Sequence, residues 1–107
     1  MDKLRIDVLG TDYEVITLNE RDRIMINMNT DGYCDLTSKK IVVCGNENDF
    51  DNQDVYTRNI IRHELIHAFL NESGIPLNIS FHNENMVEWL AGQFPKLMDC
   101  FETVGCE

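Results

Sequence analysis

The chain has 107 residues, 43% of them hydrophobic, and its 9 Lys and Arg against 19 Asp and Glu give a net charge of −10 at pH 7. This length predicts one domain spanning residues 1–107, and the acidic balance argues against nucleic acid as a partner, because phosphate binding needs clustered Lys and Arg. No apolar run reaches the length of a membrane span, and the first five residues lack the apolar core of a signal peptide. We therefore expect a cytoplasmic protein with no membrane partner.

Residues 4–18 predict a β-hairpin, because apolar and polar residues alternate on both sides of a short turn. The turn is expected at Gly10–Asp12. The polar stretch at residues 19–23 predicts either a loop or a short helical turn.

Residues 24–29 alternate again, which predicts another strand. Asp31-Gly32 is the clearest hairpin signal in the chain, and residues 33–36 would continue the strand after it. Residues 37–39 predict a second turn. The β-branched run Lys40–Cys44 that follows predicts a strand, which we expect at an exposed edge of the sheet.

The four cysteines, Cys34, Cys44, Cys100 and Cys106, form no C-x-x-C pair, so their spacing gives little support for a cysteine zinc site. In a cytosolic chain we expect reduced thiols, two of them on strands or near the core. Cys34 and Cys44 could face each other across a hairpin, where a disulfide would be geometrically possible.

Residues 45–54, rich in Asn and Asp, predict a loop leading into a long helix at about residues 52–73. Asp51 and Asn52 offer N-cap side chains, and Gly74 predicts the end of the helix. Apolar residues recur along it at helical spacing, namely Val55, Ile60, Ile61, Leu65, Phe69 and Leu70.

The middle of this helix, residues 63–67, reads His-Glu-Leu-Ile-His and matches the H-E-x-x-H motif. Two histidines four residues apart project from the same helix face, so His63 and His67 can bind one zinc ion, with Glu64 in reach of a water molecule beside it. Such matches also occur by chance in ordinary helices, but the helical context and the acidic helix that follows favour a zinc site. Arg62, next to the motif, is expected to be a solvated surface residue.

A second helix is expected from about Asn83 to Phe101, after a connection of some extended character at residues 75–82. Pro95 lies inside this pattern and should kink or break the helix. The apolar stripe consists of Met86, Val87, Leu90, Phe94, Leu97, Met98 and Phe101.

A catalytic zinc ion usually takes three protein ligands, so the chain must supply one more. Glu84 and Glu88, one turn apart on the second helix, are both candidates on spacing. His82 would complete an all-histidine site in a minor alternative; it could also be an ordinary loop histidine or contact a substrate oxyanion. Tyr33 and Tyr56 are further oxyanion candidates.

The stretch Asn83–Glu88 resembles the glutamate helix of thermolysin-type enzymes. With the motif helix before it, the chain resembles a gluzincin metallopeptidase, and in size and element order it is similar to the small bacterial and phage-encoded zincins related to the ImmA/IrrE group. The motif resemblance covers about residues 55–98, whereas the strand region matches only in order and length. It implies that Glu84 binds zinc and that Glu88 orients His63. Glu88 replaces the Asp of the thermolysin pattern and remains the alternative ligand.

The predicted fold class is α+β: three to five short strands in an antiparallel or mixed sheet, then the H-E-x-x-H helix and the glutamate helix, in one minimal zincin-like domain. The resemblance implies a hydrolase in which one Zn²⁺ per chain activates water and Glu64 acts as general base. An extended peptide or protein substrate could add as a strand along Lys40–Cys44. The alternative function is a non-catalytic zinc-binding regulatory or protein-interaction domain.

Overall fold

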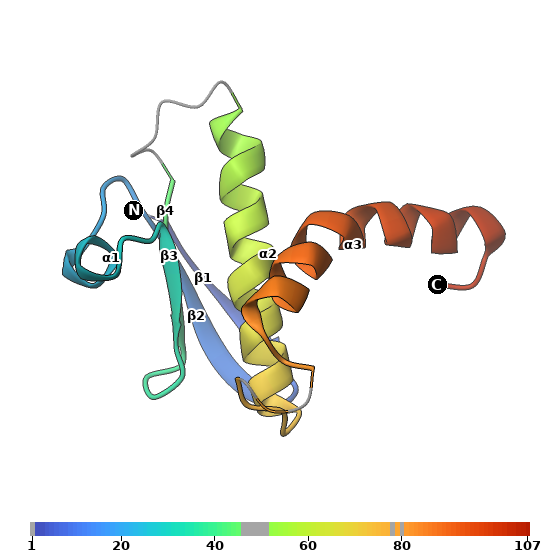
Figure 1. Cartoon of the computed structure of the whole chain (residues 1–107), viewed down its shortest axis with the longest axis horizontal. Coiled ribbons are helices and arrows are strands. Elements are labelled where there is room, and N and C mark those ends of the chain that lie inside the picture. Colours follow the sequence, from blue (N-terminus) through green and yellow to red (C-terminus); the bar gives the residue numbers. More distant parts are fainter. Residues whose placement is uncertain (1, 46–51, 78, 80) are drawn as a thin grey trace.

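The computed structural model describes residues 2–45, 52–77, 79 and 81–107. Within these residues the chain is α+β, with a four-stranded mixed sheet and three helices (Figure 1). In chain order the elements are β1 (Asp2–Val8), β2 (Thr11–Leu18), α1 (Arg23–Met28), β3 (Gly32–Asp35), β4 (Lys40–Cys44), α2 (Gln53–Glu72) and α3 (Glu84–Val104). None of the helices in the described ranges is long and apolar enough to cross a membrane.

The sheet has the order β1-β2-β4-β3, so β4 lies inside the sheet and the expectation that Lys40–Cys44 forms an exposed edge is wrong. β4 pairs parallel to β2 and antiparallel to β3, whereas β1 and β2 pair antiparallel. Residues 41–44 are all buried. A continuous apolar run of this kind is typical of a strand that is covered on both faces.

The first hairpin is confirmed, but its turn is Leu9-Gly10 and not Gly10–Asp12. Both turn residues have positive φ, 52° and 91°, as a two-residue hairpin turn of the primed type requires. Thr11 is already paired with Val8 in the ladder. The glycine therefore occupies the second turn position.

Residues 24–29 were expected to form a strand, but Arg23–Met28 is a helix. The Asp22 side chain accepts a hydrogen bond from the Met25 backbone N–H at 2.9 Å, and Asn29 ends the helix with φ 52°. Met25 is buried, while the apolar residues at 24, 26 and 28 are exposed. The helix caps Asp22 and Asn29 thus outweigh the strand-like alternation of this short segment, in which only Met25 is buried.

Gly32 opens β3 and is not part of a hairpin turn, so the interpretation of Asp31-Gly32 is wrong. A Cβ placed on Gly32 would lie 2.6 Å from Ile60 Cγ2 of α2 and 3.2 Å from Val43 Cγ1. The glycine allows β3 to lie close against α2. The predicted turn at residues 37–39 is confirmed, with Asp35 accepting backbone hydrogen bonds from residues 37 and 38.

The cysteines are free, and the disulfide considered between Cys34 and Cys44 does not form. Cys34 is paired in register with Ile41, and it packs with the apolar cluster that includes Ile41 and Val43. Cys44 belongs to the cluster of Met25 and Val42. Successive side chains of β4 point to opposite faces, so the two thiols lie on opposite sides of the sheet.

Two apolar clusters hold the layers together. α2 covers one face of the sheet and α1 lies on the other side, as Figure 1 shows. The α2 side contains Val8, Tyr13, Val15, Ile41, Val43 and Ala68, with Ile60, Ile61 and Leu65 packed against them. The smaller α1 side contains Met25, Val42 and Cys44. The buried stripe of α2 leaves its remaining face available for the site.

The helix predicted at residues 52–73 is confirmed, with Gln53–Glu72 helical and flanked by Asn52 and Ser73. The expected cap Asp51 lies outside the described residues, as does most of the predicted loop at 45–54, and the Asn52 side chain makes no capping hydrogen bond. The described residues of the 75–82 connection form turns and bends and no strand. Gly74 has φ 90°, consistent with the predicted stop.

α3 starts one residue after its cap Asn83, whose side chain accepts a hydrogen bond from Met86 N at 2.9 Å. It runs through Pro95 to Val104, so the proline does not break it, although Figure 1 shows α3 bending midway. A proline has no N–H for the carbonyl four residues earlier, which here belongs to the buried Ala91. Arg62 Nε donates to that carbonyl at 2.7 Å, so Arg62 is not the solvated surface residue expected.

We expect Arg62→Met to lower the free energy of unfolding by about 1–3 kcal/mol, because the Ala91 carbonyl would lose its donor. In a Pro95→Ala background the residue at 95 regains an N–H, and the same substitution should cost much less. Urea unfolding of the four proteins measures this coupling. Arg58→Met, which breaks an exposed ion pair with Asp54, is the control. Equal costs of Arg62→Met in both backgrounds would contradict this assignment.

Glu72, at the end of α2, joins the helix to the sheet. Its carboxylate accepts hydrogen bonds from Thr11 Oγ1 at 2.9 Å, Tyr13 Oη at 2.7 Å and Lys39 Nζ at 2.9 Å. The Tyr13, Lys39 and Thr11 bonds lower the pKa of Glu72 from its ordinary 4.5 to about 2. A carboxyl with a lowered pKa stabilises the fold above its unfolded pKa, and that contribution is lost as the pH falls from about 4.5 toward 2.

Glu72→Gln should therefore lower the melting temperature at pH 7, and the gap to wild type should narrow as the pH falls below about 4.5. Thermal unfolding followed by circular dichroism at several pH values measures the gap. Glu102→Gln, on the exposed far end of α3, serves as the control and should follow wild type throughout. A melting-temperature difference that stays constant down to pH 2 would show that the Glu72 charge contributes nothing to stability.

Candidate metal centre

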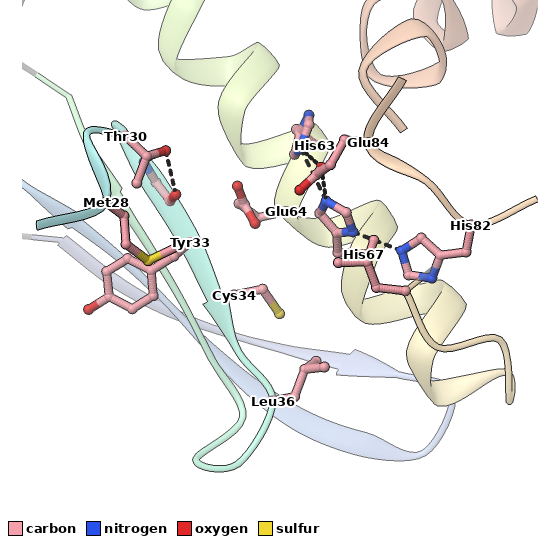
Figure 2. A pocket seen from close by; sticks show the side chains of 12 residues that line it. Met28, Thr30, Tyr33, Cys34, Leu36, His63, Glu64, His67, His82 and Glu84 are labelled. Carbon is pink, nitrogen blue, oxygen red and sulfur yellow. Dashed lines mark hydrogen bonds and ion pairs between the residues drawn. The ribbon is translucent and has the colours of Figure 1, made fainter. Parts of the chain in front are cut away.

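The motif residues lie where the apolar stripe of α2 meets its open side. Ala68 of this helix is fully buried against the sheet, while the side chains of His63 and His67 keep 17% and 12% of their surface exposed. Both imidazoles project from the same face of α2 toward the start of α3 (Figure 2). The helix that the motif requires is therefore present, and the ring-centroid distance of 4.8 Å brings the two histidines together.

Glu84, the first residue of α3, completes a three-residue cluster with these histidines. Its Oε1 lies 3.1 Å from His63 Nε2 and 2.7 Å from His67 Nε2, and the two Nε2 atoms are 3.1 Å apart. Figure 2 shows the Glu84 carboxylate meeting both rings. The Asn83 cap fixes the first turn of α3, and it thereby sets the position of Glu84.

This donor set fits a zinc ion. Two imidazole nitrogens and one carboxylate oxygen, converging on one point with a fourth position free, are the usual ligands of a catalytic zinc site. The Glu84 side chain is 64% exposed, so the cluster is open to solvent on its α3 side. Among the described residues, His63, His67 and Glu84 form the group able to hold a metal ion.

Glu88 contacts the far nitrogen of His63. Its Oε2 lies 2.9 Å from His63 Nδ1, and its Oε1 accepts a hydrogen bond from Asn59 Nδ2 at 2.9 Å. A carboxylate can only accept, so Glu88 is a partner for a hydrogen on Nδ1 of His63, and Nε2 is the ring atom left for Glu84 or for a metal ion. The geometry thus brings Glu84, and not the alternative Glu88, to the point shared by the histidines.

His82 is buried, with 2% of its surface exposed, so it is not an ordinary loop histidine. Its Nε2 lies 2.8 Å from His67 Nδ1 and its Nδ1 lies 2.5 Å from the Ile75 carbonyl oxygen. It therefore reaches the nitrogen of His67 that points away from Glu84. The alternative with His82 as third ligand does not match this arrangement.

Glu64 lies between the histidines and β3, and only 9% of its surface is exposed (Figure 2). Burial raises the pKa of this carboxyl to about 7; the His63 ring opposes the shift, and the Glu84 and Glu88 charges add to it. Burial also lowers the pKa of His67, against the influence of Glu84, which favours the neutral ring that a metal ligand needs. For Glu84 burial acts to raise the pKa, but the hydrogen bonds and charges of His67 and His63 lower it overall.

These groups line a cleft of about 420 Å³ between α2 and β3. Apart from Tyr33 and His82, its other walls were not anticipated from the sequence, because they depend on β3 lying at the edge of the sheet beside α2. They are Met28, Thr30, Gly32, Tyr33, Cys34, Leu36 and Leu77, together with His82. Burial, and then the Glu64 charge, raises the pKa of the Cys34 thiol to about 12.

The tyrosines considered as oxyanion donors are engaged elsewhere. The Tyr33 hydroxyl donates to Asp22 Oδ2 at 2.6 Å, although its ring lines the cleft. The Tyr56 hydroxyl donates to Asp31 Oδ2 at 2.5 Å. Neither hydroxyl is directed at the histidine cluster.

Comparison of the chain with protein-family models, with curated proteins and with solved structures finds no match. The resemblance to short gluzincins therefore depends on the motif residues of the sequence alone. The contacts of His82 were not predicted from the sequence, since no pattern in the segment before α3 indicates that its histidine will be buried.

The metal content of protein purified without added metal tests the ligand set. We expect about one zinc ion per chain in wild type, no stable binding in His63→Ala or Glu84→Gln, and an affinity lowered about 10–100-fold in Glu88→Gln, which loses only the group behind His63. Glu84→Gln and Glu88→Gln are a matched pair one turn apart on α3, and Glu102→Gln is the control. Complete loss in Glu88→Gln with retention in Glu84→Gln would exchange the two roles.

Proposed function

We propose that this chain is a small zinc metallopeptidase of the gluzincin type, with His63, His67 and Glu84 as zinc ligands and Glu64 as general base. The observation that carries the proposal is the convergence of two Nε2 atoms and one carboxylate oxygen within 2.7–3.1 Å, beside a buried carboxylate in an open cleft. Chance alone is a poor explanation for three metal-ligand atoms that converge beside a buried carboxylate.

When bound, Zn²⁺ lowers the pKa of a coordinated water molecule and polarises a carbonyl group. Glu64 borders the cleft on the β3 side of the histidines and is available to accept a proton from water and to deliver it to a leaving amine. Glu88 contacts His63, and the Asn83 side chain caps the first turn of α3 that carries Glu84, so the ligands require little rearrangement. Peptide-bond hydrolysis is the reaction that this division of roles supports.

The substrate strand is assigned to β3 in this proposal, because β4 is interior. β3 has no strand neighbour on its outer side among the described residues, and three of its residues, Gly32, Tyr33 and Cys34, line the cleft. An extended peptide could add there by backbone hydrogen bonding, with its scissile bond toward Glu64. Met28, Leu36 and Leu77 would give the cleft an apolar wall suited to apolar side chains.

Glu64→Gln is the test of catalysis. The variant should fold and bind zinc as wild type does, because Glu64 is not a ligand in this proposal, but peptide cleavage should fall at least 100-fold with the loss of the general base. Cleavage of a peptide library of mixed sequence, followed by mass spectrometry, provides the activity measurement and requires no defined substrate. Glu102→Gln is the matched control.

Two outcomes would overturn the proposal. A wild-type protein that takes up no zinc would remove the metal site. Zinc binding without any peptide cleavage that depends on Glu64 would favour the alternative, a non-catalytic domain in which zinc joins α2 to α3.

A further inference from the structure

We infer that the α3 arm, residues 95–104, docks into an apolar groove of a second copy of this chain, so that the protein forms a dimer with two-fold symmetry. The groove lies between β1, α2 and the first half of α3, on a different side of α2 from the two motif histidines. The inference does not rest on the proposed function, because it uses none of the residues assigned to the metal site.

The groove has a volume of about 560 Å³, and its walls are mostly apolar. They consist of Ile6, Val8, Leu9, Leu65, Ile66, Phe69, Leu90 and Phe94, with Asp7 and Arg62 as polar members. A cavity of about 150 Å³ holds one benzene molecule, so the groove has room for about three side chains of that size. Leu9 and Phe69 keep 54% and 52% of their surface exposed, so these walls face water in a single copy.

The α3 arm carries apolar residues that also face water in a single copy. Both buried residues of α3, Val87 and Ala91, precede Pro95. Figure 1 shows the half of the helix after Pro95 projecting away from α2 and the sheet. On this arm Leu97 and Val104 are 40% and 74% exposed. A helix with such an apolar stripe is stabilised when the stripe is buried against another surface.

The stripe of the arm continues the wall of the groove. Its residues recur at three- or four-residue intervals and therefore lie along one face of α3, namely Leu90, Phe94, Leu97, Phe101 and Val104. The first two line the groove, and the other three belong to the arm. Groove and arm thus form one apolar strip, half of it a concave surface and half of it a projecting helix.

A second copy fits this strip because the strip is complementary to itself. If two α3 helices cross antiparallel with the two-fold axis between residues 95 and 96, Leu97 meets the partner subunit's Phe94. By the same symmetry Phe101 meets the partner subunit's Leu90, at the wall of the partner's groove. Every contact is then made twice, and the assembly closes at two copies. An amphipathic helix lying in an apolar groove is a common way for proteins to associate.

The exposed apolar area is close to what a stable dimer needs. The exposed fractions along the strip add up to about three fully exposed side chains; they belong to Ile6, Leu9, Phe69, Phe94, Leu97 and Val104. At about 200 Å² for each side chain this is roughly 600 Å² per copy, most of the about 800 Å² that each partner buries in a standard interface. An apolar patch of that size is at the upper end of what monomers expose.

Charge opposes this association, which gives the dimer a recognisable salt dependence. Each copy carries a net charge of −10, so two copies repel each other most strongly at low ionic strength. Salt screens this repulsion but does not weaken apolar contacts. We expect the dimer to be tighter at about 0.5 M than at about 0.05 M sodium chloride. A dimer held by surface ion pairs would weaken instead, and that result would contradict the inference.

Sedimentation velocity of the whole chain between about 1 and 200 µM tests the inference, with a dissociation constant expected in the micromolar range. The mass should rise from 12.4 kDa toward twice that value. A reductant is included because the exposed Cys100 and Cys106 could otherwise link copies by disulfides, and a chelator is included to prevent bridging by metal ions.

Two charge substitutions separate the arm from the groove. Leu97→Glu on the arm and Phe69→Glu in the groove wall should each weaken the dimer at least about 100-fold, because each would place an unpaired charge in an apolar contact. Both side chains are exposed in a single copy, so the fold should tolerate the changes. Ile26→Glu is the control, since Ile26 is 63% exposed on α1, on the other side of the sheet, and should leave the dimer unchanged.

A wild-type chain that keeps a mass of 12.4 kDa at 200 µM would overturn the inference and leave the groove to another occupant, such as a helix of a different protein. Loss of the dimer in Leu97→Glu but not in Phe69→Glu would also overturn it, because the arms would then meet outside the groove. Circular dichroism establishes that each variant is folded, and the wild-type mass decides the first point even if a variant is not.

Discussion

The packing of α2 across the sheet is the contact on which the rest of the molecule depends. Ala68 is fully buried and Leu65 packs into the same cluster, so one side of the helix is fixed against β1, β2 and β4. Gly32 lets β3 approach the same helix closely. With these contacts made, His63 and His67 can only face the start of α3, and Glu64 can only face β3. Core packing and site geometry are therefore determined by the same helix.

The parts that the sequence predicted well are those specified locally. α2 combines apolar residues at helical spacing with a glycine at its end, and this pattern gave its bounds to within a residue. α1 was missed because its apolar residues fit a strand-like alternation, and only the Asp22 cap indicates a helix. The interior place of β4 was missed although its continuous apolar run is typical of a strand covered on both faces; what leaves no local trace is its parallel pairing with β2.

The same contrast between locally specified features and features that depend on distant residues applies to the site. Four-residue spacing on a helix was enough to bring His63 and His67 together. Spacing left both Glu84 and Glu88 open as ligands, and only the resemblance to a glutamate helix favoured Glu84; in the structure Glu84 lies between the rings and Glu88 behind His63, while metal binding itself stays a prediction. The contacts of His82 depend on how a turn segment folds back on the end of α2. Arg62 was misjudged for a related reason. The Ala91 carbonyl that it binds lacks a helical donor only because residue 95, four positions later on α3, is a proline.

The parallel pairing of β2 with β4 has a consequence for how the chain folds. The β1–β2 and β3–β4 ladders join neighbours in sequence and can form early, but Glu14 must find Lys40 across α1 and β3 before the sheet is whole. Closing such a connection costs chain entropy and slows folding. β3 reaches the rest of the sheet only through β4, so the cleft acquires its second wall after the slow step. The complete cleft in a refolding chain should accordingly form with the last kinetic phase, later than the signal from helix formation.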